Sequence, residues 1–230
     1  MSETGVFVTG TDTGVGKTFI ATLLASSLVK RGVDVGVMKP VETGSTEIIP
    51  SDAKYLINAA ETEDPPELVC PLVYRDPLSP MNAAEREGLE VDLDKIRSAY
   101  RELTERHKLL LVEGAGGLLV PLNQRYYIID MVVEMGLPLI IVAHDKLGCI
   151  NQILLTLNAA KDRNIDVLAI VLNRMDMRGD LSTRGNSETI KKLTGRNPVT
   201  VGYTPVKGKL YKHPDADSLV TRVLAALPAV

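Results

Sequence analysis

Short apolar runs alternate with helical patterns along most of the chain. Continuous apolar runs occupy residues 6–8, 109–112, 139–143 and 167–172, and two further predicted strands, at 33–38 and 199–201, are mostly apolar. A strand that is apolar at every position is buried on both faces, which is typical of a parallel sheet with helices on each side. The pattern therefore predicts a doubly wound α/β fold with a mostly parallel sheet.

Helical periodicity fills the intervals between these runs. In residues 17–31, Phe19, Ile20, Leu23 and Leu24 recur at the spacing of one helix face. Further helices are predicted at residues 52–60, with Ser51 as the N-cap, and at 92–106, 149–163, 184–194 and 217–227.

Two stretches show neither pattern. Residues 40–51 are rich in Gly, Ser, Thr and Pro and are predicted to be a loop. Residues 63–80 carry five prolines and are predicted to form an irregular covering segment. No repeat, low-complexity tract or linker divides the chain, so residues 1–230 are expected to form a single domain.

Composition narrows the class of protein. The chain is 45% hydrophobic and 24% charged, which is typical of a globular protein. A net charge of −3 and the absence of Trp argue against a nucleic-acid partner. No apolar run reaches the ~18 residues that a membrane span needs. Two cysteines are too few for a disulfide framework, so a cytoplasmic location is expected.

A glycine-rich segment, residues 9–18, follows the first predicted strand and opens the first predicted helix. In that context Gly-Lys-Thr is typical of a phosphate-binding P-loop, because backbone N–H groups and the helix dipole converge on an anion. Lys17 is expected to reach the β- and γ-phosphates, and the Thr18 hydroxyl to hold Mg²⁺. The alternative is an ordinary glycine-rich turn without a nucleotide.

The loop is a variant of the usual pattern. Five residues rather than four separate Gly10 from Gly16, so Thr11 stands where the first glycine usually lies. Further phosphate contacts are expected from Thr13, Gly14, Val15 and Gly16.

Two charged residues follow predicted strands. Glu113 comes directly after the run 109–112, where the acidic residue of a Walker B strand lies, and is expected to hold Mg²⁺. Gly114, Ala115 and Gly116 after it leave room for a bound nucleotide. Lys39 ends the second predicted strand. Its positive charge would therefore lie in the ligand-binding cleft at the carboxyl ends of the strands. The alternatives are a solvated loop glutamate and a lysine that extends into solvent.

Four segments together resemble the dethiobiotin synthetases. They are Gly-Thr-Asp-Thr-Gly-Val-Gly-Lys-Thr (10–18), Lys-Pro-Val-Glu-Thr-Gly (39–44), Leu-Val-Glu-Gly-Ala-Gly-Gly (111–117) and Lys-Leu-Gly-Cys-Ile-Asn (146–151). Their order and spacing match from about residue 5 to 173, and the variant P-loop spacing is the family's own form.

The resemblance implies a P-loop NTPase fold and an ATP-dependent carboxylation. In this reaction 7,8-diaminononanoate and CO₂ form the ureido ring of dethiobiotin, with release of ADP and phosphate, during biotin synthesis. It also implies that Asp52 joins Thr18 and Glu113 in holding Mg²⁺. Lys39 becomes the catalytic residue that holds the carbamate against the γ-phosphate, and Thr11 and Thr43 hydrogen-bond the amine or carbamate.

The resemblance also implies contacts with the adenine of ATP and with the carboxylate of the diamine. Asn173 would contact the edge of the adenine, and Pro205 would lie in the loop on the purine side. The substrate carboxylate would bind at Gly148, Cys149, Ile150 and Asn151, contributed by the partner subunit of a homodimer. The alternative is that Gly148 only connects a strand to a helix and that Asn151 is an N-cap.

Two other classes share this loop. Partition and septum-site ATPases are dimeric switches with a second lysine early in the P-loop, whereas residues 11–13 here contain none. Amide-forming synthetases need a glutaminase domain with a nucleophilic cysteine. Neither Cys70 nor Cys149 lies in such a motif, so both classes are less favoured.

Overall fold

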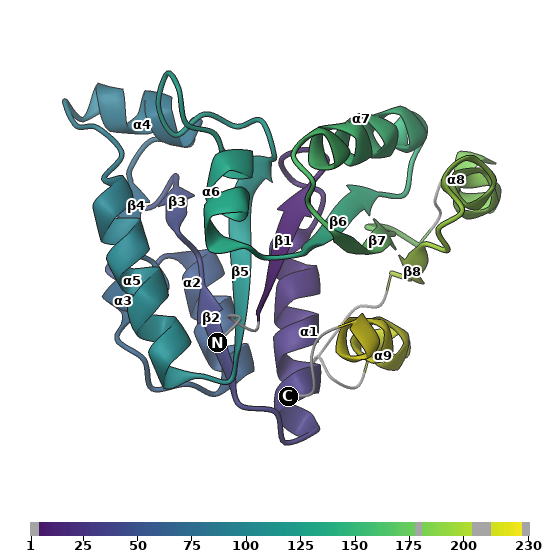
Figure 1. Cartoon of the computed structure of the whole chain (residues 1–230), viewed down its shortest axis with the longest axis horizontal. Helices are drawn as coiled ribbons and strands as arrows, with labels where there is room; N and C mark the ends of the chain where they lie inside the picture. Colours follow the sequence, from purple (N-terminus) through teal and green to yellow (C-terminus); the bar gives the residue numbers. More distant parts are fainter. Residues whose placement is uncertain (1–4, 178–180, 204–212, 227–230) are drawn as a thin grey trace.

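The computed structural model describes residues 5–177, 181–203 and 213–226. Its main feature is a six-stranded sheet in the order β2-β5-β1-β6-β7-β8, in which every neighbouring pair is parallel (Figure 1). The strands are β1 (Gly5–Gly10), β2 (Val35–Met38), β5 (Leu109–Gly117), β6 (Leu139–His144), β7 (Val167–Asn173) and β8 (Val199–Val201). The predicted parallel α/β sheet is confirmed.

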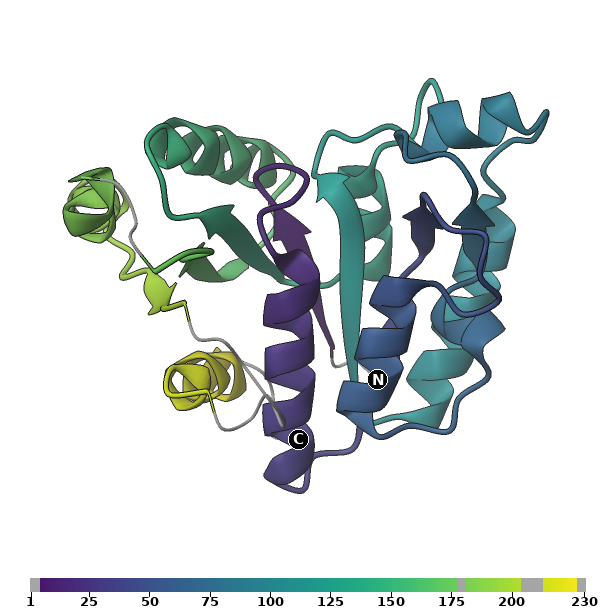
Figure 2. The same ribbon diagram turned by 180° about the vertical axis from the view of Figure 1, so that it is seen from behind.

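Helices cover both faces of this sheet (Figures 1 and 2). One face packs on α1 (Lys17–Lys30), α2 (Ser51–Ala60) and α9 (Ala216–Ala226). The other packs on α5 (Leu93–Arg106), α6 (Ile128–Met135), α7 (Cys149–Asp162) and α8 (Asn186–Thr194). Successive strand residues point to opposite faces, so Val6 and Val8 enter one core and Phe7 the other. This double burial explains the continuous apolar runs.

The stretch predicted as irregular contains regular elements. Strand β3 (Val41–Thr43) pairs in parallel with β4 (Leu72–Tyr74) in a separate two-stranded sheet, which α4 (Pro80–Arg86) contacts, while α3 (Pro66–Val69) packs against α2, α5 and β2. The prolines do not prevent these helices, because Pro66 and Pro80 occupy first-turn positions where no backbone N–H is needed. The predicted loop at 40–51 is therefore wrong at 41–43 and at 51 but confirmed over 44–50, and the prediction of irregular structure throughout 63–80 is wrong.

Some predicted boundaries also change. The second strand begins at Val35 rather than residue 33. The N-cap of α2 is Pro50, and Ser51 is the first helical residue, so the predicted Ser51 cap is wrong. Helix α6 was not predicted, and a short 3₁₀ turn (Leu181–Arg184) precedes α8. Among the described residues, no helix is both long and apolar enough to cross a bilayer.

Candidate active site

The P-loop joins β1 to α1 at the carboxyl edge of the sheet. Gly14 and Gly16 have φ angles of 72° and 88°, in the left-handed region that favours glycine. A Cβ atom on Gly16 would lie 2.2 Å from Nδ2 of Asn173. That amide donates a 3.0 Å hydrogen bond to the Val15 carbonyl, so the end of β7 supports the loop directly.

Lys17 lies at the start of α1, inside the turn of this loop. Its ammonium donates to the Asp12 carbonyl at 3.1 Å. Burial, together with the positive charge of Lys39, lowers the pKa of Lys17 to about 8. Two buried ammonium groups that line one pocket form a site that favours polyanions.

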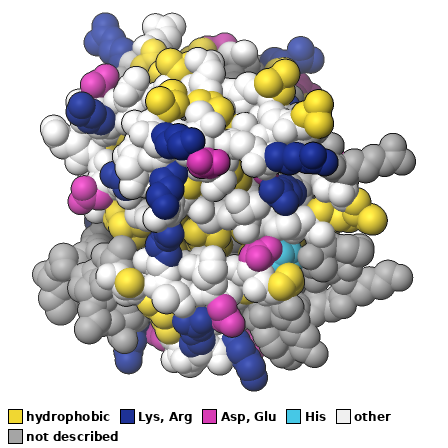
Figure 3. Space-filling view, turned by 90° about the vertical axis from the view of Figure 1, so that its right-hand side faces the viewer, with side chains coloured by type: hydrophobic (Ala, Val, Ile, Leu, Met, Phe, Trp, Pro, Cys, Tyr) yellow, Lys and Arg dark blue, Asp and Glu magenta, His cyan; other side chains and the backbone are white. Residues whose placement is uncertain are grey.

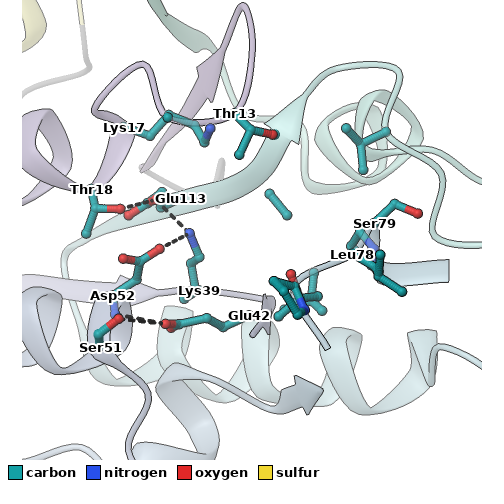
Figure 4. A pocket seen from close by; sticks show the side chains of 18 of the residues that line it. Thr13, Lys17, Thr18, Lys39, Glu42, Ser51, Asp52, Leu78, Ser79 and Glu113 are labelled. Carbon is teal, nitrogen blue, oxygen red and sulfur yellow. Dashed lines mark hydrogen bonds and ion pairs between the residues drawn. The ribbon is translucent and has the colours of Figure 1, made fainter. Parts of the chain in front are cut away.

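Lys39 occupies the centre of the carboxylate cluster (Figure 4). Its Nζ lies 2.6 Å from Oε1 of Glu113 and 2.9 Å from Oδ2 of Asp52. Burial alone would lower the pKa of Lys39, but the two carboxylates outweigh it and raise the pKa above its ordinary value. Lys39 is therefore a fixed positive charge whose ammonium lies in the pocket, not in solvent.

The oxygen atoms around Glu113 suit a magnesium ion. The Thr18 hydroxyl donates to Oε1 of Glu113 at 2.8 Å, whereas the buried Oε2 has no hydrogen-bond partner among the described residues. Mg²⁺ is usually bound by one or two carboxylates together with phosphate oxygens. Among the described residues, no group of three or more His, Cys, Asp or Glu side chains is placed to bind a metal ion.

Glu42 is a buried carboxylate that the sequence reasoning did not assign. It is 6% exposed and accepts hydrogen bonds from the backbone N–H groups of Asp52, at 3.0 Å, and Ala53, at 3.1 Å. Burial raises its pKa, while these two N–H groups act in the opposite direction. The motif at 39–44 contained Glu42, but nothing local distinguishes it from an exposed glutamate.

These groups line one pocket of about 820 Å³. The expected residues that line it are Thr13, Gly14, Gly16, Lys17, Thr18, Lys39, Thr43, Asp52, Glu113, Ala115 and Gly116. Residues not foreseen that line it are Val41, Glu42, Ser51, Pro77, Leu78, Ser79, Pro80, Val120 and Met175. The site is thus built from six separate parts of the chain.

Several expected residues lie elsewhere. Thr11 lines an adjoining hollow of about 300 Å³ with α7, because the loop turns after Gly10, and it does not line the pocket that holds Lys39. Val15 is buried, and Gly114 packs so closely on Phe7 that a Cβ would lie 2.7 Å from its ring. Neither lines the pocket.

The segment 148–151 forms the start of α7 and lines neither cavity of its own chain. Gly148, with a φ of 93°, is the N-cap, so the alternative with Asn151 in that role is wrong. Cys149 is fully buried. Pro205 lies outside the described residues.

The arrangement can bind a polyphosphate and stabilise charge on a transferred phosphoryl group. Lys17, Thr18 and Lys39 line the same pocket, and the Thr18 hydroxyl and the Lys39 ammonium both donate to Oε1 of Glu113. Phosphoryl transfer depends mostly on such positioning and charge stabilisation.

Comparison with known proteins agrees with this geometry. A family model described as an AAA domain matches residues 4–229. The chain is 39% identical to an ATP-dependent dethiobiotin synthetase of Thermodesulfovibrio yellowstonii, over 83% of this chain and 85% of the relative. It is 43% identical to that of Anaeromyxobacter dehalogenans (strain 2CP-1), over 86% and 88%, and 38% identical to that of Methanocaldococcus jannaschii, over 82% and 88%.

Two solved structures share the fold. The MinC:MinD cell division complex of Aquifex aeolicus matches with a TM-score of 0.59 at 13% identity, covering 96% of this chain and 95% of that chain. Chloroplast FtsY from Physcomitrella patens matches with a TM-score of 0.51 at 16% identity, covering 97% of this chain and 65% of that chain. At these identities the likeness concerns the fold alone.

Proposed function

The chain belongs to the family of ATP-dependent dethiobiotin synthetases, and we propose that it closes the ureido ring of dethiobiotin from 7,8-diaminononanoate, CO₂ and ATP. The observation that supports the proposal is the position of Lys39. Asp52 and Glu113 hold its ammonium in the same pocket as Lys17 of the P-loop. This is the reaction that the sequence motifs imply.

The reaction explains why two lysines share the pocket. One substrate amine adds to CO₂ and loses a proton, giving a carbamate. A carbamate oxygen then attacks the γ-phosphorus of ATP, and ADP leaves. The second amine attacks the carbonyl carbon of the resulting mixed anhydride, phosphate leaves, and the five-membered ring closes with loss of a proton.

Each lysine stabilises a different anion in this sequence. Lys17, at the end of the P-loop, is placed to neutralise the β- and γ-phosphates. Lys39 is placed to hold the carbamate against the γ-phosphate, which lowers the repulsion between two anions that must react. Because the pKa of Lys39 is raised, its charge is permanent over the physiological pH range.

Magnesium is proposed as the cofactor. Thr18, Asp52 and Glu113 would hold it, and when bound it supplies charge neutralisation to the triphosphate. Oε2 of Glu113 is buried and has no hydrogen-bond partner among the described residues, which supports this assignment.

The adjoining hollow suits the aliphatic part of the substrate. It meets the larger pocket at Thr13 and Val120, and Leu118, Leu119 and Leu155 line it. Thr13 lines both cavities and is proposed to contact the reacting groups. Thr11 lines the hollow, and its buried hydroxyl has no hydrogen-bond partner among the described residues, so it stays a proposed substrate contact there. Thr43 remains the proposed carbamate contact.

A homodimer would complete the site. Leu119 and Leu155 are 65% and 61% exposed beside the hollow, as expected of positions that a second subunit covers. The residues proposed to hold the substrate carboxylate, 148–151, do not reach either cavity of their own chain, so the partner would have to supply them. Gly148 has free space around it, since a Cβ there meets nothing within 4 Å.

Adenine recognition by Asn173 and by the loop around Pro205 remains part of the proposal. Asn173 already supports the P-loop, so binding adenine would add a second contact to its side chain. We also propose that residues 1–230 act as one domain, which the shared six-stranded sheet supports.

The setting proposed for this enzyme is the cytoplasm, without nucleic-acid or membrane partners. Neither Cys70 nor Cys149 forms a disulfide, and both are buried. On the face that Figure 3 presents, basic, acidic and hydrophobic side chains are interspersed, with no continuous basic tract. A switch ATPase is not favoured, because the P-loop lacks the second lysine and the relatives are synthetases.

The test is a product assay with purified protein. ADP, phosphate and dethiobiotin should form together only when the diamine, bicarbonate and ATP are all present. Hydrolysis of ATP at the same rate without diamine or bicarbonate would indicate a switch ATPase and refute the proposal.

A further inference from the structure

Glu42 lies at the edge of the pocket, but both of its carboxylate oxygens are turned toward the start of α2 (Figure 4). Oε1 accepts from the Asp52 N–H at 3.0 Å and from the Ser51 hydroxyl at 3.3 Å. Oε2 accepts from the Ala53 N–H at 3.1 Å. Its hydrogen-bonding capacity is thus directed at one helix end.

Helix α2 has no cap of its own. Pro50 occupies the N-cap, and no side chain of that position accepts a hydrogen bond. An N-cap Ser, Thr, Asp or Asn would normally accept from the N–H of the second or third helical residue. Those residues here are Asp52 and Ala53, the two that Glu42 binds. The carboxylate of Glu42, in β3, therefore accepts the hydrogen bonds that an N-cap side chain would accept. It also places a negative charge at the positive end of the helix dipole.

The capped residue is also a residue of the site. Glu42 holds the backbone of Asp52, and the side chain of Asp52 lies 2.9 Å from Lys39 Nζ. The first turn of a helix frays most readily when its N–H groups are unsatisfied. Removal of Glu42 would therefore release the carboxylate proposed to hold Mg²⁺ and to orient Lys39.

We propose that Glu42 is a positioning residue, which fixes the first turn of α2 and thereby sets Asp52 for metal binding and turnover. The inference rests on the proposed function for the role of Asp52. This role differs from that of a group that touches substrate, because the side-chain hydrogen bonds of Glu42 with the described residues all go to residues 51–53 at the start of α2.

The first experiment compares Glu42→Ala and Glu42→Gln with the wild type. In Glu42→Ala we expect kcat to fall and the Mg²⁺ concentration for half-maximal rate to rise, each by about tenfold, as for loss of a group that orients a metal ligand. The KM for ATP should change by less than about threefold, because the P-loop lysine is untouched. Glu42→Gln keeps an acceptor and should show a smaller effect. Glu47→Gln, an exposed glutamate of the same segment, is the matched control.

The decisive variant moves the cap back to its usual position. Pro50→Ser in the Glu42→Ala background gives α2 a local N-cap, because the backbone at residue 50 is already extended, with φ −66° and ψ 161°. The double variant should recover both the Mg²⁺ dependence and kcat to within about threefold of Pro50→Ser alone. Recovery of thermal stability without recovery of the Mg²⁺ dependence would show that Glu42 acts on a ligand directly, and would overturn the inference. An unchanged kcat and Mg²⁺ dependence in folded Glu42→Ala would overturn it as well.

A binding measurement separates this inference from the proposed function. Calorimetric titration with ADP at several Mg²⁺ concentrations needs no diamine and no product. If the wild type binds ADP with Mg²⁺ but forms no dethiobiotin, the proposed reaction fails, while the Mg²⁺ dependence of ADP binding in Glu42→Ala still tests the role of Glu42. Equal Mg²⁺ dependence in that variant and the wild type would refute the role in metal positioning.

Discussion

The Nζ atom of Lys39 lies 2.6 Å from Oε1 of Glu113, although the two residues are 74 positions apart in the chain. Strands β2 and β5 are parallel neighbours with Met38 opposite Val112, so Lys39, which follows β2, lies level with Glu113 in the middle of β5. The pair is buried, and removing either partner would leave the other as an uncompensated charge.

Lys39→Gln should lower kcat by about two to three orders of magnitude, because it removes charge stabilisation at the reacting anion. Binding of ADP with Mg²⁺ should change little, since Lys17 and the P-loop are intact. In the absence of nucleotide, Mg²⁺ alone should raise the thermal midpoint of this variant more than that of the wild type, because Lys39 no longer neutralises Glu113. Lys54→Gln, on the exposed side of α2, is the control. Loss of nucleotide binding as severe as in Lys17→Ala would contradict this division of roles.

Glu113→Gln should weaken the Mg²⁺-dependent rate at low metal concentration. A neutral amide is a poorer magnesium ligand than a carboxylate, so about tenfold more Mg²⁺ should be needed for half-maximal activity. A rate titration over Mg²⁺ concentration measures this shift. A defect that does not vary with metal concentration would argue against a ligand role for Glu113.

Gly16→Ala should abolish nucleotide binding, because its Cβ would lie 2.2 Å from the Asn173 amide that supports the loop. Gly14→Ala is the informative comparison. Gly14 has a similar positive φ of 72°, but its added Cβ would meet nothing within 4 Å. It should therefore show only the cost of backbone strain, about 1 kcal/mol. Equal loss of ADP affinity in the two variants would mean that strain, not the contact with Asn173, is what excludes a side chain at Gly16.

Leu155→Glu should dissociate the proposed homodimer, because it places a charge on an exposed apolar position beside the hollow. The control is Leu193→Glu on α8, since both leucines are 61% exposed. Sedimentation velocity should show a monomer for the first variant and a dimer for the second. A dimeric Leu155→Glu protein would place the subunit contact elsewhere.

His107 should make stability depend on pH. Its ring nitrogens lie 2.8 Å from Asp34 and 2.6 Å from Asp64, and although its partial burial acts the other way, these hydrogen bonds raise the pKa of His107 above 6.5. The pKa of Asp64 is lowered below 3.8; burial opposes the shift, but hydrogen bonds from Thr62 and His107 outweigh it. The stabilisation from His107 is therefore complete below pH 6.5 and is lost as the pH rises through the folded-state pKa. The contribution of Asp64 is lost at the acid end, below pH 3.8.

Urea unfolding of the wild type and His107→Gln at several pH values measures this effect. Between the two limits the variant should be less stable by about 2 kcal/mol, the usual worth of hydrogen bonds to charged groups. The difference should shrink in alkaline buffer. A difference that is constant from pH 5 to pH 9 would exclude a role for the imidazolium charge.

The local sequence determines much of this protein. Strands buried on both faces are mostly apolar, so β1, β6, β7 and residues 109–112 of β5 were visible as runs, and the doubly wound sheet followed from them. The continuation of β5 through the buried Glu113 to Gly117 was not predicted. The P-loop is contiguous, and its glycines act through their own backbone. Lys17 and Thr18 could therefore be assigned from the sequence alone.

Other features depend on contacts between distant segments, and only the tertiary structure decided them. Thr11 was expected at the amine or carbamate, but the structure places Thr13 in the pocket with Lys39 and Thr11 only in the hollow beside α7. The first turn of α2 lacks a cap in its own sequence, and a carboxylate from β3, Glu42, supplies it. Short-range patterns report which residues are apolar and how they repeat, whereas the partner of a buried charge is set by which strands become neighbours in the sheet.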